Sequence, residues 1–187
     1  ASDVLPQRRR RVFLVGFLTA FWKGASVPFQ WPVLEQGISR KRVRDVLEDD
    51  SALHPSLRLT ETQLRAVAPR GKDAVIDVDG VAKTVMSSYR KSFQKYSQFV
   101  PVSSPPTTAD QAQPLRFLSV RECARLQGIP DDFDLRMQSS EGGTVPAGEH
   151  AAYKLVGNAV CPPLVRSVLE SIIQFMEANE GNAGSSQ

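Results

Sequence analysis

The chain has 187 residues, of which 41% are hydrophobic and 23% are charged, which is the composition of a globular domain rather than of a fibrous or low-complexity protein. Its two cysteines, Cys123 and Cys161, are too few for a disulfide framework or a metal cluster, so we expect an intracellular setting and no metal. The net charge of +3 permits a polyanionic partner without requiring one.

No apolar run reaches the roughly 20 residues that a membrane span needs. The apolar stretch from Val12 to Ala20 is short, follows four arginines and has no cleavage site, so neither a signal peptide nor a membrane partner is expected. The first residue is Ala1 rather than Met, which suggests a processed or excised chain. We expect a nuclear location in a eukaryote and a cytoplasmic one in a bacterium, and no secretion.

The first half of the chain predicts short elements of both kinds. The β-forming run Val12–Val15 predicts a buried strand, and the apolar spacing between Ser39 and Asp50 predicts a helix. A second helix is expected to begin at Thr60, because Thr60-Glu-Thr-Gln63 fits a capping box. Residues 74–86 predict a β-hairpin, in which Asp79-Gly80 supplies the positive φ angles of the turn.

The second half predicts loops around two helices. The Pro-, Ser- and Thr-rich residues 100–115 indicate an exposed linker, and residues 138–149 a Gly/Ser loop. Between them, a capping box at Ser119-Val-Arg-Glu122 opens a helix over 119–128 that Gly128 closes.

The last predicted element is a helix that begins at Pro162-Pro163, since proline is tolerated in a first turn. One apolar stripe runs along it: Leu164, Val165, Val168, Leu169, Ile172, Ile173 and Met176. Residues 179–187 read as a disordered tail. The chain offers few strands to cover this helix and Val12–Val15, so we expect exposed apolar surface on both, marking a missing partner.

Three segments carry candidate chemistry, and the first is basic. In an extended chain Gln7, Arg9 and Arg11 share one face, while Arg8 and Arg10 share the other. One amide and two guanidinia in a row suit the recognition of phosphates or bases. A solvated basic patch or a nuclear-import signal explains the same residues.

The other two segments are less specific on their own. Residues 116–133 read as a structural helix, with Glu122 used by the cap and Cys123 as a small buried residue. Gly157-Asn158 reads as a turn before a helix N-terminus, where free N–H groups suit a polar ligand. Asn158 as a plain cap and Asn158 as a ligand contact both remain open.

Together the three segments resemble the last three conserved motifs of the cytosine-5 DNA methyltransferase family, in the family's order. The first matches Gln-x-Arg-x-Arg, and the second matches Arg-Glu-x-x-Arg-Leu-Gln-Gly-x-Pro-Asp over 121–131. The third matches Tyr-x-x-x-Gly-Asn-(Ala/Ser)-Val from Tyr153 to Val160. Lys83-Thr84-Val85 resembles a pair near the end of the family's target-recognition region.

The resemblance implies an α/β chain holding part of an S-adenosylmethionine-dependent, Rossmann-like methyltransferase fold and a small mixed α+β target-recognition domain. Residues 1–20 would be a strand segment of the catalytic domain. Residues 21–149 would be the target-recognition domain, including the helix over 119–128 and the linker over 100–115. Residues 150–178 would return to the catalytic domain.

The implied reaction transfers a methyl group from S-adenosylmethionine to C5 of a cytosine flipped out of double-stranded DNA. The family's glycine-rich cofactor loop, Pro-Cys nucleophile motif and Glu-Asn-Val motif do not occur in this sequence. We therefore expect the nucleophile in an amino-terminal portion, of the same polypeptide or of a partner subunit, and expect this chain alone to be inactive.

The resemblance also assigns roles to residues. Arg9 and Arg11 would line the target-cytosine pocket with support from Gln7, and Asn158, Ala159 and Val160 would close over the cofactor. The expected contacts to the DNA backbone are Thr84, Ser87, Arg90 and Lys91. The expected structural residues are Arg121, Glu122, Arg125, Gly128 and Gly157.

Two other functions are compatible with these motifs. One is a non-catalytic DNA-binding or regulatory module descended from the family. The other is a tRNA cytosine-5 methyltransferase, whose recognition region carries a Cys-Phe-Thr signature. Residues 21–115 contain no cysteine, which argues for DNA.

Overall fold

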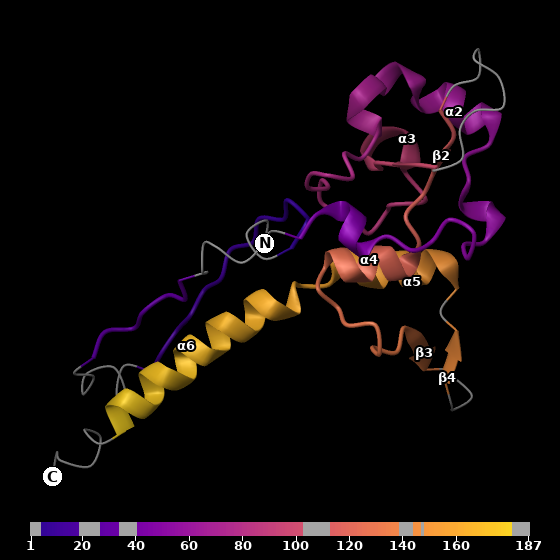
Figure 1. Ribbon diagram of the computed structural model, residues 1–187. Coiled ribbons are helices and arrows are strands. Elements are labelled where there is room, and N and C mark those ends of the chain that lie inside the picture. The colour runs from indigo at the N-terminus through magenta and orange to yellow at the C-terminus, as the bar shows by residue number, and fades with distance from the viewer. Residues whose placement is uncertain are drawn as a thin grey trace, which may run out of the picture.

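A computed structural model describes residues 5–18, 27–33, 41–102, 113–138, 144–146 and 148–180. Short helices and strands form a rounded body, from which the long helix α6 extends beside the extended amino-terminal segment (Figure 1). The elements in chain order are η1 (Val43–Val46), η2 (Pro55–Leu57), α2 (Glu61–Val67), η3 (Ala68–Ala74), α3 (Phe93–Tyr96), β1 (Val100–Pro101), β2 (Leu115–Arg116), α4 (Val120–Leu126), β3 (Arg136–Gln138), β4 (Thr144–Pro146), α5 (Glu149–Asn158) and α6 (Pro162–Glu180).

Both predicted capping boxes are confirmed. At the start of α2, the backbone N–H of Gln63 donates to Oγ1 of Thr60 at 3.3 Å, and the N–H of Thr60 donates to Oε1 of Gln63 at 2.9 Å. Ser119 and Glu122 make the same reciprocal pair at α4. Gly128 ends that helix with a φ of 76°, as expected of a closing glycine.

The predicted helix over 39–50 is wrong. Only Val43–Val46 are helical, as a short 3-10 turn, and residues 39 and 40 lie outside the described part. The backbone N–H groups of Val43 and Arg44 donate to Gly80 and Val78 instead of to a preceding turn. Val43 and Val46 are both buried, so one 3-10 turn satisfies the apolar spacing that suggested a longer helix.

The predicted hairpin over 74–86 is also wrong. The turn forms, since Gly80 N donates to Asp77 O at 3.1 Å, but its arms diverge. Val75 pairs with Phe99, and Ala82 pairs with Gln7 at the other end of the chain. Gly80 does not adopt a positive φ; in the described ranges only Gly71 and Gly128 do.

Two predicted loops contain strands. Val100–Pro101, placed in a linker, pairs antiparallel with Leu115–Arg116, while residues 103–112 lie outside the described part. Arg136–Gln138 pairs antiparallel with Thr144–Pro146, and Gly148 is the N-cap of α5. Local composition indicated loops, whereas the strand partners lie at least six residues away in sequence.

The exposed apolar surface that we expected is present. Val12 and Leu14 are 86% and 94% exposed, and Leu169 and Ile173 on α6 are each 52% exposed. Val12–Val15 is nevertheless not a strand, because no backbone in the described residues pairs with it. The segment runs as an extended trace beside α6 (Figure 1).

The end of the chain partly departs from the expected tail. Helix α6 continues to Glu180, and Asn179 near its end is buried. The Oδ1 of Asn179 accepts from the backbone N–H of Val27, and its Nδ2 donates to the carbonyl of Val27. Residues 181–187 lie outside the described part. By length and composition alone, the stretch 149–179 is long and apolar enough to cross a membrane. This is weak evidence for a membrane span, because residues 159–161 divide the stretch into two helices. The absence of a membrane partner stays a prediction.

Candidate functional site

Gln7 joins the first motif to the rest of the molecule. Its side chain is fully buried, and Nε2 donates to the carbonyl of Leu126 at the end of α4, at 3.1 Å. Its Oε1 accepts from the backbone N–H of Val85 at 3.4 Å. The backbone of the same segment pairs with Ala82. Gln7 therefore fixes the basic segment against both α4 and residues 82–85.

Arg9 lies two residues after Gln7, on the same face of the extended segment, and is buried as well. Its Nη1 donates to the carbonyl of Val85 at 3.2 Å, and its Nη2 donates to those of Gly157 and Ala159 at 2.9 and 2.7 Å. Burial lowers the pKa of Arg9, and the neighbouring charge of Arg11 lowers it further. These three hydrogen bonds of the guanidinium all go to backbone carbonyls, which places Arg9 in the framework of the site.

Arg11 is the arginine that remains accessible. It is exposed, and its Nη1 donates at 2.7 Å to the carbonyl of Arg10, its own neighbour. A guanidinium with most of its donors facing solvent is suited to bind an incoming base or phosphate. Of the two arginines predicted for a pocket, the structure leaves Arg11 available and uses Arg9 internally.

The predicted structural residues surround the exit of α4. Arg121 donates to the carbonyls of Pro130 and Phe133, and Arg125 pairs with Asp131 at 2.7 Å. Hydrogen bonding from Arg125 lowers the pKa of the Asp131 carboxyl. These bonds hold the loop after α4 closed against the helix.

Gly128 and Gln127 connect this exit to the last motif. A Cβ on Gly128 would lie 2.9 Å from Cδ of Pro163 at the start of α6, so only glycine fits here without displacement. Nε2 of Gln127 donates to the carbonyl of Val156 in α5 at 3.3 Å. The end of α4 thus contacts both of the last two helices.

A buried ion pair of Arg116 was missed by the sequence reasoning. Its Nη1 and Nη2 pair with the two carboxylate oxygens of Glu122 at 2.8 and 2.9 Å, and its Nε pairs with Asp50 at 2.5 Å. Burial alone would lower the pKa of Arg116, but Glu122 and Asp50 raise it overall. A charged residue inside the apolar run Leu115–Leu118 was the signal in the sequence.

The predicted turn at Gly157-Asn158 is wrong, because both residues belong to α5. Gly157 faces residues 86–87 so closely that a Cβ there would overlap the backbone N of Ser87. This close approach explains why the helix carries a glycine next to its end.

We expect Gly157→Ala to destabilise the chain. Overpacking costs ~1–3 kcal/mol, which outweighs the gain of up to about 1 kcal/mol from replacing glycine in a helix. Urea unfolding measures the difference, with Gly16→Ala as the control, since a Cβ on Gly16 meets nothing within 4 Å. Equal stability of the two variants would show that the Ser87 backbone moves away without cost.

The residues predicted to contact the DNA backbone divide into two groups. Thr84 donates its hydroxyl to the carbonyl of Arg8 at 2.5 Å, and Arg90 lies 4.5 Å above the Phe117 ring while pairing with Glu149. Ser87 is half-buried, whereas Lys91 is exposed. Arg90 is therefore committed within the molecule, and Lys91 is the member of the set best placed for phosphate.

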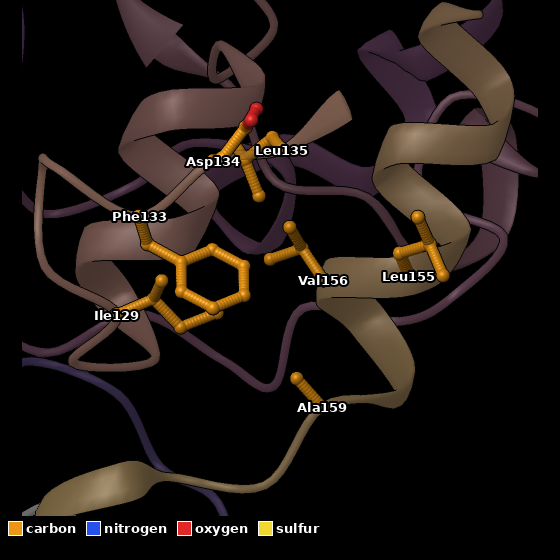
Figure 2. A pocket seen from close by; sticks show the side chains of 7 residues that line it. All are labelled: Ile129, Phe133, Asp134, Leu135, Leu155, Val156 and Ala159. Carbon is orange, nitrogen blue, oxygen red and sulfur yellow. The ribbon is translucent and has the colours of Figure 1, made fainter. Parts of the chain in front are cut away.

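The residues predicted to close over a cofactor lie where α5 ends. Asn158 and Val160 are exposed, and Asn158 lines a hollow of about 430 Å³ together with Ala151, Lys154, Leu155 and Ala159. Figure 2 shows a second cavity, of about 290 Å³, between the exit of α4 and α5. Leu155 and Ala159 line both hollows, so they adjoin. The apolar second cavity was not predicted.

A comparison with protein families decides what this junction of three motifs is. The model described as C-5 cytosine-specific DNA methylase matches residues 4–174. The chain belongs to this family. The match covers nearly the whole chain, and the resemblance drawn from the sequence is confirmed at the level of the family.

Curated relatives of this methyltransferase chain include type II methyltransferases. It is 26% identical to the type II methyltransferase M.MspI of Moraxella sp. over 90% of the chain and 35% of that protein. It is 27% identical to M.NlaX of Neisseria lactamica over 93% of the chain and 50% of that protein. The chain thus spans between a third and a half of the length of these relatives.

Solved structures support the fold. The Dnmt2 methyltransferase of S. pombe aligns with a TM-score of 0.55 at 20% identity, over 88% of this chain and 49% of that one. The Entamoeba histolytica methyltransferase EhMeth aligns with a TM-score of 0.54 at 14% identity, over 80% and 44%. The mixed α/β chain therefore shares a methyltransferase fold.

The cysteines of this methyltransferase chain do not resemble nucleophiles. Cys123 and Cys161 are both free and buried. Burial raises the pKa of the Cys123 thiol, with Glu122 adding to the effect, and this disfavours the reactive thiolate. No group of metal-ligating side chains occurs within the described residues.

Two buried tyrosines predict how the chain responds to alkali. Tyr89 donates to the carbonyl of Gln98 and accepts from the N–H of Leu118, whose carbonyl accepts from Tyr153. Burial raises the pKa of both phenols above the value of about 10 found in an unfolded chain. Their contribution to stability is therefore constant below about pH 10 and is lost as the pH rises beyond it.

We expect the phenolate absorbance of Tyr89 and Tyr153 to appear together with unfolding and not before it. An alkaline titration that follows absorbance at 295 nm and circular dichroism in one sample tests this. Ionisation of all three tyrosines of the chain while the dichroism stays native would contradict it.

Proposed function

We propose that the chain is the carboxyl-terminal portion of a DNA (cytosine-5-)-methyltransferase, with the α/β fold shared between this part and an amino-terminal catalytic portion. In this proposal the complete enzyme transfers a methyl group from S-adenosylmethionine to C5 of a flipped cytosine in double-stranded DNA. One observation carries it: Gln7 and Arg9 bind the first motif to the ends of α4 and α5, so that all three family motifs meet at one junction.

In this proposal the basic segment supplies one wall of the base pocket. Arg11 is exposed two residues beyond the buried Arg9, and an extended backbone directs both side chains to the same face. Cytosine presents acceptors on its ring, which match the donor fork of a guanidinium. Arg11 would bind the flipped base, while Gln7 and Arg9 would hold the strand in place.

The end of α5 would hold part of the cofactor. S-adenosylmethionine carries polar groups and a carboxylate, and the exposed amide of Asn158 beside Lys154 offers hydrogen bonds and a positive charge at one hollow. Asn158, Ala159 and Val160 therefore fit a role in binding S-adenosylmethionine. When bound, the cofactor supplies the methyl group; these residues orient it and shield it from water.

The exposed apolar faces support a missing amino-terminal portion. Val12 and Leu14 are exposed on the amino-terminal segment, and Leu169, Ile173 and Met176 are exposed on α6. The relatives continue well beyond the matched region, which leaves a partner of the right size to cover these faces. An extended segment whose residues 12–15 pair with no other backbone in the described part is also suited to enter a sheet. We propose that this portion carries the nucleophilic cysteine.

Binding to nucleic acid tests the recognition half of the proposal. The chain should bind duplex DNA with an affinity that falls with salt, and Lys91→Gln should reduce the slope of log K against log salt by about 1. Arg166→Gln, at an exposed position of α6, is the control and should leave the slope unchanged. A chain that prefers tRNA would instead support the tRNA methyltransferase, and binding without any transfer by the complete protein would support a regulatory module.

A further inference from the structure

The guanidinium of Arg9 bridges two parts of the site that are far apart in sequence. On one side it belongs to the basic segment and stands two residues before Arg11. On the other side its Nη2 donates to the carbonyls of Gly157 and Ala159, which are 148 and 150 residues away. These two carbonyls flank Asn158, so one side chain fixes the backbone on either side of it.

The bridge is short and rigid. Arg9 is 3% exposed, its Nη1 also holds the carbonyl of Val85, and the bond to Ala159 is 2.7 Å long. Its Nε has no hydrogen-bond partner among the described residues, where the bonding of the side chain is directed at the three carbonyls. A charged donor that is buried against neutral carbonyls resists displacement, because losing these bonds would leave the charge unsatisfied.

We propose that Arg9 is a positioning residue that couples the base-binding segment to the cofactor turn at residues 157–160. The inference rests on the proposed function and goes beyond it, since it assigns Arg9 to neither ligand. Any shift of the segment that occurs when Arg11 takes a base is transmitted through the Arg9 guanidinium to the backbone around Asn158. The affinities for DNA and for S-adenosylmethionine are then linked through this residue.

Hydrogen exchange of this chain tests the physical bridge. In Arg9→Met, the amide of Ala159, which donates to the carbonyls of Leu155 and Val156, should exchange about tenfold faster. The charge-assisted bonds that hold the Gly157 and Ala159 carbonyls are lost in this variant, while the aliphatic stem still packs. Arg8→Met is the matched control, because Arg8 is adjacent but exposed. The amides of α4 should be unaffected in both variants. Faster exchange throughout α4 would indicate general destabilisation and would overturn the proposal.

The linkage itself is measured in the full-length protein that contains this chain. The ratio of S-adenosylmethionine dissociation constants without and with unmethylated duplex should be about fivefold or more in the wild type. It should fall to near one in Arg9→Met and recover in part in Arg9→Lys. A merely structural role would weaken both affinities and keep the ratio, which would refute the coupling. If the wild type binds no S-adenosylmethionine at all, the proposed function fails, and the exchange of the Ala159 amide still decides whether Arg9 forms the bridge.

Discussion

Glu122→Gln should lower the free energy of unfolding by about 3–5 kcal/mol, which is the usual cost of removing one partner from a buried ion pair. Glu122 is fully buried and accepts both Nη groups of Arg116 as well as the N–H groups of Ser119 and Glu48. The amide offers one acceptor oxygen in place of two and introduces a buried donor beside a guanidinium. Chemical denaturation of the two proteins at one pH measures the effect.

Asp131→Asn provides the comparison for that result. Asp131 also receives two hydrogen bonds from an arginine, Arg125, but it is exposed, and exposed ion pairs contribute little. We expect its unfolding midpoint to move by a small fraction of the shift caused by Glu122→Gln. Equal shifts for the two variants would mean that burial does not determine the strength of these pairs.

Arg11→Met should reduce methyl transfer by the complete enzyme by about 10²–10³-fold, the usual loss when one preorganised donor is removed from a reacting group. The unfolding midpoint should not change, because Arg11 is exposed and its Nη1 bonds only the carbonyl of its own neighbour among the described residues. Steady-state transfer of labelled methyl groups to duplex DNA, beside a denaturation curve, separates the two effects.

Arg8→Met is the control for that assay as well. Arg8 carries the same charge on the same segment, but alternation in an extended chain turns it to the opposite face. We expect it to retain most of the activity. If both variants lose activity equally, the segment contributes only charge, and the assignment of a base contact to Arg11 is wrong.

Features with local causes were predictable from the sequence. The capping boxes at Thr60 and Ser119 join residues three apart, and the closing glycine of α4 lies two residues beyond the helix. The apolar stripe of α6 likewise shows its period within one helix. These patterns need no knowledge of the rest of the chain, so the predicted starts of α2 and α4 and the final helix were correct.

Features that depend on distant partners were not predictable. Residues 74–86 have the composition of a hairpin, yet Val75 pairs with Phe99 and Ala82 pairs with Gln7, which lie far from them in sequence. Val12–Val15 has the composition of a strand but has no partner within the described residues. Composition reports the tendency to pair and not the partner.

In the site, too, local features were predictable and contacts between distant residues were not. The motifs identified the segments that meet, but not how each side chain is used. Arg9, assigned to a base pocket, bonds carbonyls up to 150 residues away, and Arg90, assigned to DNA, lies over Phe117 and pairs with Glu149. Spacing alone cannot distinguish an arginine that binds a ligand from one that binds the backbone.

Methyl transfer by reconstituted protein tests the central claim most directly. The chain would be assayed alone and together with an amino-terminal portion that carries a Pro-Cys motif, using labelled S-adenosylmethionine and duplex DNA. A parallel sample would carry Cys123→Ala and Cys161→Ala, which remove both thiols of this chain at little cost in volume. We expect no transfer by the chain alone, and full transfer on addition of the partner with or without the two cysteines. Transfer by the chain alone would contradict the account. So would a loss of transfer when the folded chain without Cys123 and Cys161 is combined with the amino-terminal portion.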